Sequence, residues 1–462
     1  MIELATVELP RFGIEETRPE IPVEVYQARL TATVECMRHD GLDFLVVYGD
    51  REHFANLAYL TGFDPRFEES LLLLDRKGHR LLIVGNECMG YLPDERLGCD
   101  VALFQEFSLM GQPRGSSRPL RNIFADFGIH KGATVGCTGW KYFDGALIEN
   151  GPNACDLPSY IVDLLRSMAA ADRNVLNATG IFMDPAAGLR VINEPEQIVA
   201  FEYASIRTSE AMLAFIGNLR EGVQEQELER LFDGAGLPLS CHRMISFGEK
   251  VRRGLASPSP NRARLGDTFT AAFGVTGALT CRAGCVARGP EDLPTDQREF
   301  YSHFAANYFD VVATWYEQVR VGAVSGDVFR AVDACRDDRL YAFAVNPGHL
   351  LHLDEWVHSP FSTGGRVELR SGMALQMDII PVSEGPFYYI NGEDGIVLAD
   401  AALRDALAAR WPACWKRIQA RREFMHNALG IDLHESVLPL SNIPGWLPPF
   451  ALSRDKILVK RI

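Results

Sequence analysis

The first part of the chain alternates amphipathic stretches with short apolar ones. Residues 22–40 carry apolar side chains at helical spacing, and residues 42–48 form a run rich in β formers. Residues 70–84 predict a hairpin, because a Lys-Gly pair divides two apolar runs. Residues 133–136 predict another strand, and residues 157–166 another helix. This alternation predicts an α/β domain.

An irregular stretch, residues 171–195, separates this region from the rest. Its Asn, Asp, Pro and Gly content favours loops, so we place a domain boundary within it and predict domains 1–180 and 181–462. Pro195 suits the first turn of a helix, and an apolar stripe continues from it for about five turns. Further elements are predicted as a helix at 225–232, two strands within 268–280, strands at 375–380 and 395–398, and one long helix at 401–427.

Composition narrows the class of protein. The chain has 462 residues, 47% of them apolar and 23% charged, as in ordinary globular proteins of two or three domains. Its net charge of −15 opposes binding to nucleic acid. The start has no signal-peptide pattern, and the uncharged run from Thr268 to Cys281 is too short to span a bilayer. We therefore expect a cytoplasmic protein with no membrane partner, and the ten scattered cysteines to be reduced thiols.

Several landmarks occur in a fixed order along the chain. Residues 56–62 read Asn-Leu-Ala-Tyr-Leu-Thr-Gly, residues 189–198 read Leu-Arg-Val-Ile-Asn-Glu-Pro-Glu-Gln-Ile, and residues 219–228 run from Leu-Arg-Glu-Gly to Glu-Leu. Short motifs follow at Gly266-Asp267, Pro347-Gly348-His349, Ser371-Gly372-Met373 and Gly392-Glu393-Asp394. In this order they resemble the landmarks of the creatinase/aminopeptidase P superfamily.

The resemblance implies a fold and an assembly. It implies an α/β N-terminal creatinase-like domain followed by an α+β C-terminal domain of the pita-bread type, in which helices cover a curved antiparallel sheet. It also implies a homodimer in which the N-terminal domain of one chain closes the active site of its neighbour.

The peptidases of this superfamily hold two divalent metals with two Asp, one His and two Glu. By resemblance the first Asp falls at Ala271 or Ala272 and the second within 283–285, and residues 268–289 contain no acidic side chain. His349, Asp378 and Glu393 match the remaining three positions. Arg282 and Arg288 add positive charge, so we expect no dinuclear metal site and no cofactor.

The superfamily also includes metal-free enzymes that cleave carbon–nitrogen bonds of small molecules. Our leading hypothesis is a metal-independent hydrolase of a small, polar, nitrogen-containing metabolite, with His349, Asp378 and Glu393 as catalytic residues. Creatine is a poor candidate substrate, because residues 254–261 lack the histidine that creatinase uses. The alternatives are a non-catalytic ligand-binding protein, a divergent Xaa-Pro metallopeptidase and a lyase.

Five further residues are candidates for binding the substrate: Arg66, Phe67, Arg288, His352 and His358. Each role has a structural alternative.

Arg66 would instead pair with Glu68 or Glu69 on the surface. The stretch from His352 to His358 would be either a strand with one polar face or a solvated loop.

Asp378 would be neutralised by Arg282 or Arg288, and His349 would bond the backbone of a strand. Cys281 and Cys285 are candidate thiolate nucleophiles or inert buried thiols.

Overall fold

The computed structural model describes residues 1–143, 147–171, 174–383 and 389–461. The chain divides into two compact units, one of residues 21–190 and one that joins residues 1–20 to residues 191–462. The predicted domains, 1–180 and 181–462, differ from this division mainly in the first 20 residues. None of the helices in the described residues is long and apolar enough to cross a membrane.

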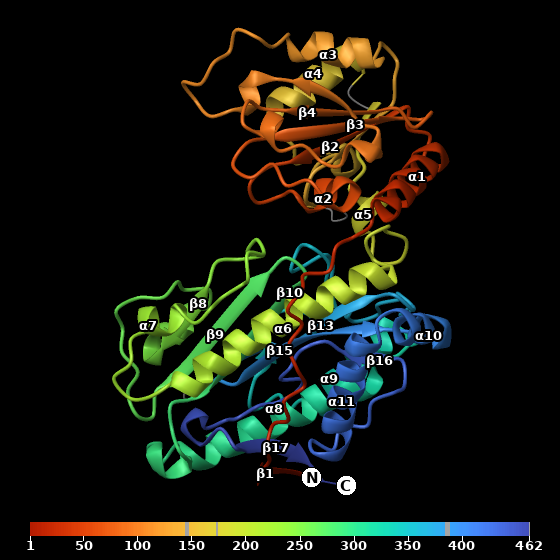
Figure 1. Ribbon diagram of the computed structural model, residues 1–462. Helices are drawn as coiled ribbons and strands as arrows, with labels where there is room; N and C mark the ends of the chain where they lie inside the picture. Colours follow the sequence, from red (N-terminus) through yellow and green to blue (C-terminus); the bar gives the residue numbers. More distant parts are fainter. Residues whose placement is uncertain (144–146, 172–173, 384–388, 462) are drawn as a thin grey trace. The chain divides into compact units, whose positions relative to one another are not determined.

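The unit of residues 21–190 is an α/β layer built on one six-stranded sheet (Figure 1). Strands β2, β3 and β4 pair antiparallel, whereas β4–β5, β2–β6 and β6–β7 pair parallel. The strands, in sheet order, are β5 (Asp100–Leu103), β4 (Arg80–Val84), β3 (Ser70–Asp75), β2 (Phe44–Gly49), β6 (Val135–Thr138) and β7 (Val175–Asn177). The helices are α1 (Val23–His39), α2 (Ala55–Thr61), α3 (Leu120–Phe127), α4 (Ser159–Ala169) and α5 (Gly180–Met183).

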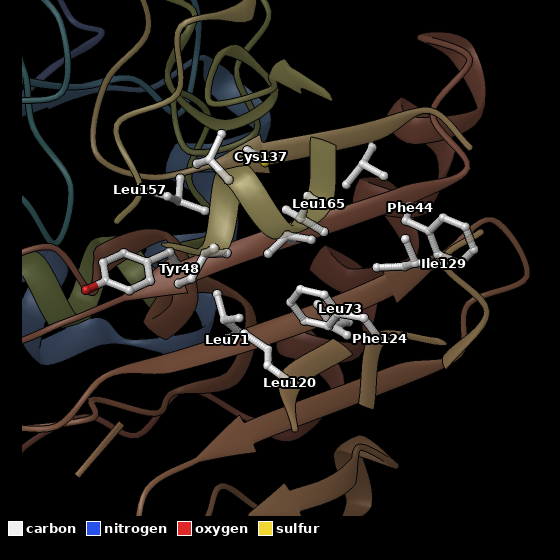
Figure 2. Close-up of a cluster of buried hydrophobic side chains, with 14 of the residues drawn as sticks. Phe44, Tyr48, Leu71, Leu73, Leu120, Phe124, Ile129, Cys137, Leu157 and Leu165 are labelled. Carbon is white, nitrogen blue, oxygen red and sulfur yellow. The ribbon is translucent and has the colours of Figure 1, made fainter. Parts of the chain in front are cut away.

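The core of this unit confirms the predicted apolar strands and helices. Figure 2 shows Phe44 and Leu73 of the sheet against Phe124 and Ile129, with Leu165 of α4 in the same cluster. Each of these side chains is at least nine-tenths buried, which removes apolar surface from water at roughly 25 cal/mol per Å². The predicted hairpin corresponds to β3 and β4.

The other unit is built on a seven-stranded antiparallel sheet in the order β12-β13-β15-β10-β9-β8, with β16 paired to β15 (Figure 1). Helix α6 packs along β9 and β10. The strands are β8 (Met244–Phe247), β9 (Thr268–Val275), β10 (Ala278–Cys285), β12 (His349–Leu350), β13 (Ala374–Asp378), β15 (Asn391–Leu398) and β16 (Val437–Pro439). The helices are α6 (Pro195–Asn218), α7 (Glu225–Glu229), α8 (Arg298–Gln318), α9 (Ser325–Cys335), α10 (Ala401–Arg410) and α11 (Pro412–Asn427).

Two further pairs of strands complete this unit. Strand β1 (Ile2–Thr6) pairs antiparallel with β17 (Lys456–Lys460), so the first residues of the chain join the last. Strand β11 (Ala342–Phe343) pairs with β14 (Pro381–Val382).

The helix predicted at 401–427 is two helices. Helix α10 ends at Arg410 and α11 begins at Pro412, because proline has no amide hydrogen to continue the helical ladder. Trp411 and Trp415 are partly buried and pack against an apolar cluster.

Candidate functional site

Strand pairing brings three of the predicted site residues together. Asp378 of β13 lies directly opposite Glu393 of β15, and His349 begins the neighbouring strand β12. One ligand-type atom from each of these side chains lies within 4.8 Å of those of the other two, and all three side chains are buried. His349, Asp378 and Glu393 are called the acidic cluster below, together with Glu355, which joins them from a loop.

The backbone before His349 fixes where its ring points. Gly348 has φ of +95°, and a Cβ there would lie 2.9 Å from the indole nitrogen of Trp315, so this position requires glycine. The same indole N–H donates to the carbonyl of Pro347 at 3.0 Å, and the amide of Gly348 donates to the carbonyl of Asp378. The sequence Pro-Gly-His therefore holds the histidine beside β13.

A tight loop then folds back over the histidine. The amide of Leu350 donates to the carbonyl of His358, and the amide of Val357 donates to that of Leu350, so residues 351–357 form a closed turn. This turn stacks Trp356 on the His349 ring, with centroids 4.1 Å apart, and places Glu355 Oε1 3.0 Å from His349 Nε2.

The two nitrogens of His349 have different partners. Nδ1 is 3.2 Å from the carbonyl of Leu350, which favours a hydrogen on Nδ1. Nε2 faces Glu355 at 3.0 Å and Glu393 Oε1 at 3.8 Å. Burial opposes the charged ring, yet the Glu355 carboxylate beside it raises the pKa of His349 well above its ordinary value.

The acids of the cluster have different proton affinities. Burial raises the pKa of the Asp378 carboxyl to about 7, and burial together with the charge of Asp378 raises the pKa of Glu393 well above its usual range. Burial also acts on Glu355, but the imidazolium of His349 holds its pKa below the ordinary value. The cluster therefore combines an ion pair, His349 with Glu355, with Glu393, which holds its proton at neutral pH, and Asp378, which is partly ionised there.

A row of residues continues across the sheet from this cluster. Glu393 pairs with Cys281 of β10, Cys281 with Ala272 of β9, and Ala272 with Met244 of β8. Residues directly opposite each other on antiparallel strands point to the same face, so Ala272 faces the cluster side and Ala271 does not. Ala272 packs in an apolar group with Leu279, Cys281, Cys241 and Met244.

The same register tests whether the residues fit two metal ions. Ala283 pairs with Asn391 of β15, two residues from Glu393, and so lies on the cluster face. The positions where the resemblance places the two aspartates therefore carry methyl groups. The donor set that remains, one imidazole and the carboxylates of Asp378 and Glu393, does not fit a pair of dications.

Arg282 does not lie where metals would. It points to the opposite face of the sheet, where it forms a fully buried ion pair with Asp394 at 2.8 Å. Arg288 is exposed beyond the end of β10 and pairs with Asp292. The prediction that either arginine neutralises Asp378 is therefore wrong, because both already bind other acids.

The other predicted substrate contacts are placed separately. His352 is fully buried with its ring 5.4 Å from that of Phe201 on α6, and His358 is partly buried. The predicted strand through them is wrong, because the segment turns to close the loop over His349. The solvated-loop alternative fails for His352.

In the unit of residues 21–190, Arg66 and Phe67 are both about half exposed. Arg66 pairs with Asp64 at 3.1 Å and donates to the hydroxyl of Tyr91. The surface pair predicted with Glu68 or Glu69 is therefore formed with a different acid, and the substrate-binding roles of Arg66, Phe67, Arg288, His352 and His358 stay predictions.

Sequence reasoning missed several residues around the cluster. Tyr389 and Asn391 precede Glu393 by four and two positions, so strand alternation alone would have placed them on its face. Besides burial, the charges of Cys281, Asp378 and Glu393 raise the pKa of the Tyr389 hydroxyl.

Asn391 donates to the sulfur of Cys281 at 3.5 Å. Burial raises the pKa of the Cys281 thiol well above its usual value and that of Cys285 to about 12, which opposes a thiolate at either position.

Comparison with known proteins identifies the fold. No family model matches the sequence, and no curated protein matches it significantly. The structure is similar to the prolidase from Pyrococcus horikoshii OT3, with a TM-score of 0.62 and 16% identity over 80% of this chain and 95% of that one. It is also similar to a dipeptidase from Mycobacterium ulcerans (TM-score 0.62, 17% identity, 82% and 95% covered) and to X-Pro aminopeptidase from Thermotoga maritima (TM-score 0.60, 15% identity, 80% and 95% covered).

Proposed function

Starting from the pita-bread fold of the creatinase/aminopeptidase P superfamily, which this chain has, we propose that it is a hydrolase that cleaves a carbon–nitrogen bond without a metal. Its substrate is a small, polar, nitrogen-containing metabolite. The observation that carries the proposal is the convergence of His349, Asp378 and Glu393 in a buried cluster whose metal-binding partners are replaced by Ala272 and Ala283.

The dimensions of the cluster suit a water molecule or a reacting polar group. The three ligand atoms lie within 4.8 Å of one another, so a point central to them is at most about 2.8 Å from each atom, which is hydrogen-bond distance. An oxygen at this centre would touch all three side chains at once. Positioning of this kind is the first requirement for general acid–base catalysis.

The proton affinities assign complementary roles. Asp378, with a pKa of about 7, accepts a proton from the attacking water, and Glu393, which keeps its proton near neutral pH, donates one to the departing nitrogen. Water then adds to carbon as the carbon–nitrogen bond breaks, giving an acid or alcohol and an amine. The imidazolium of His349, held in place by Glu355, places a positive charge beside the developing oxyanion.

The remaining expectations belong to the same proposal. The enzyme is a cytoplasmic homodimer. The unit of residues 21–190, which corresponds to the predicted N-terminal domain, closes the neighbour's site with Arg66 and Phe67. Arg288, His352 and His358 contribute to substrate recognition. The half-exposed side chains of Arg66 and Phe67 support this assignment, because both are accessible to a second copy.

A second candidate is a hydrolase with one metal ion. Its support is the donor set itself, because one imidazole and two carboxylates within 4.8 Å can hold a single divalent cation. When bound, such an ion would supply an activated water. The contact of Glu355 with His349 Nε2 disfavours it, because that nitrogen would have to leave its carboxylate to bind a metal.

The test combines metal analysis with a substrate screen. Purified protein is treated with a chelator, assayed for metal content and incubated with small amides, amidines, ureas and dipeptides while amine release is measured. We expect turnover to survive metal removal and to fall about 10²–10⁴-fold in Glu393→Gln. Asp405→Asn, which removes a carboxylate from α10 outside the cluster, serves as the control and should retain full activity.

Two results would overturn the proposal. Activity that disappears with the metal and returns with one equivalent of it would establish the one-metal enzyme. A tight ligand that is never turned over would instead make the chain a binding protein that reuses the fold.

A further inference from the structure

We infer that a basic pocket in the unit that contains the acidic cluster binds a small polyanion bearing phosphate or carboxylate groups. The pocket has a volume of about 440 Å³ and is lined by residues 247–250, 253, 261, 262, 264 and 267. None of these belongs to the acidic cluster, so the inference goes beyond the proposed function. The volume falls within the range of small-molecule sites.

The charge of this pocket contrasts with that of the whole protein. The net charge of the chain is −15, yet the lining contains Lys250, Arg253, Arg262 and Arg264 against Glu249 and Asp267. Glu249 pairs with Arg252 at 2.9 Å. The carboxylate of Asp267 accepts from the backbone amide of Arg264. Because basic side chains outnumber acidic ones in the lining, the pocket keeps an excess of positive charge.

Two of the arginines are available to a ligand. Within the described residues, no acid lies at ion-pair distance from the guanidinium group of Arg253 or Arg264, although the charge of Arg264 acts on the nearby Asp267 carboxylate. Arg262 donates to the carbonyl of Gly222 and lies 4.0 Å from Glu227. Unpaired guanidinium groups in one pocket repel each other, and an anion that accepts from both removes this repulsion.

The walls of the pocket are held in place by a buried carboxylate. Glu225 is fully buried, and its oxygens accept from the amide of Phe247, from Ser259, from Asn261 and from the ammonium group of Lys250. Three of these partners, Phe247, Lys250 and Asn261, line the pocket. The lining is therefore pre-organised, which lowers the entropic cost of binding.

The experiment measures anion binding to the full-length protein by isothermal titration calorimetry. Inorganic pyrophosphate and citrate are titrated separately, so that the two arms distinguish phosphate from carboxylate ligands. The double variant Arg253→Gln/Arg264→Gln removes the two available guanidinium groups. Its control is Arg330→Gln/Arg339→Gln, which changes the net charge equally at two exposed arginines elsewhere.

We expect wild-type protein to bind at least one of the two anions, and the pocket variant to bind it about 10- to 100-fold more weakly. The control variant should stay within about twofold of wild type, because screening weakens distant charges. Absence of binding to both anions, or an equal loss in the control variant, would overturn the inference. Glu393→Gln should leave the affinity unchanged, and a loss there would place the anion in the acidic cluster instead.

Discussion

Glu393 and Asp394 are consecutive on β15, are both buried, and point to opposite faces of the same sheet. Asp394 pairs with Arg282 at 2.8 Å and accepts from the amide of Gly445 at 3.0 Å, while Arg282 also donates to four backbone carbonyls. Glu393 instead meets two more acids and a single imidazole. Asp394 therefore has a cation and hydrogen-bond donors of its own, whereas Glu393 shares one imidazole with other acids.

The difference separates structural from functional use of buried charge. A buried acid that serves the fold is matched by donors, because an unmatched one costs several kcal/mol. Three acids around one histidine lower stability, and a fold retains such an arrangement where proton transfer or ligand binding depends on it. Variants on either face therefore test whether Asp394 serves stability and Glu393 serves function.

Arg282→Met should have the largest effect. It leaves Asp394 buried without its cation, which costs about 3–5 kcal/mol, and we expect a matching loss in the free energy of unfolding by urea. The double variant Arg282→Met/Asp394→Leu should recover much of this loss, since an apolar pair can replace a buried ion pair. If the double variant is as unstable as the single one, the loss does not come from leaving the Asp394 charge without its cation.

Asp378→Asn should have a smaller effect, and one that depends on pH. The folded pKa of Asp378, about 7, exceeds the unfolded value of about 3.9, so the folded state binds the extra proton and wild-type stability falls as pH rises from 4 to 7. Because the pKa of His349 is also raised in the folded state, its loss of a proton lowers wild-type stability further at higher pH. Between pH 5 and 8 we expect wild type to lose about 1–3 kcal/mol and the variant to lose less.

Urea unfolding measured at each pH checks this expectation. Asp327→Asn, which removes an exposed carboxylate on α9, is the control and should run parallel to wild type. Parallel curves for wild type and Asp378→Asn would show that Asp378 is ionised in the folded protein and that the acidic cluster is better compensated than its geometry indicates.

Arg288→Gln should have the smallest effect. Arg288 pairs with Asp292 at 2.9 Å, as Arg282 pairs with Asp394, but the Arg288 side chain is exposed, so water already solvates its guanidinium group. We expect no measurable change in the urea midpoint. A clear loss of activity without a loss of stability would instead support Arg288 as a substrate contact.

The sequence predicted much of the fold, because landmark order and strand alternation survive divergence. The two-domain class, the hairpin and the helix from Pro195 are all present. The pairing of β1 with β17 was not predicted, since five residues carry no sign of a partner more than 450 positions away. The break at Pro412 could have been predicted, because proline interrupts helices.

The sequence predicted the site residues that lie on strands but not those that lie on a loop. His349 and Glu393 lie in landmark motifs and Asp378 lies in a predicted strand. Glu355 and Trp356 instead reach the cluster through the fold of a loop. Loop closure depends on tertiary contacts such as that of Leu350 with His358, which no local pattern encodes. The direction of Arg282 was available from alternation, since it neighbours Cys281, whose partner is Glu393.

The pairing of β1 with β17 delays completion of one unit until late in synthesis. A ribosome that adds about 5–20 residues per second makes β17 tens of seconds after β1, because about 450 residues separate the two strands. Residues 21–190 can complete their own sheet in that interval, while β1 waits with open hydrogen-bonding edges. In a nascent chain halted before Lys456, the unit of residues 21–190 should therefore be folded while the other unit is incomplete. We expect chaperones to bind the incomplete unit.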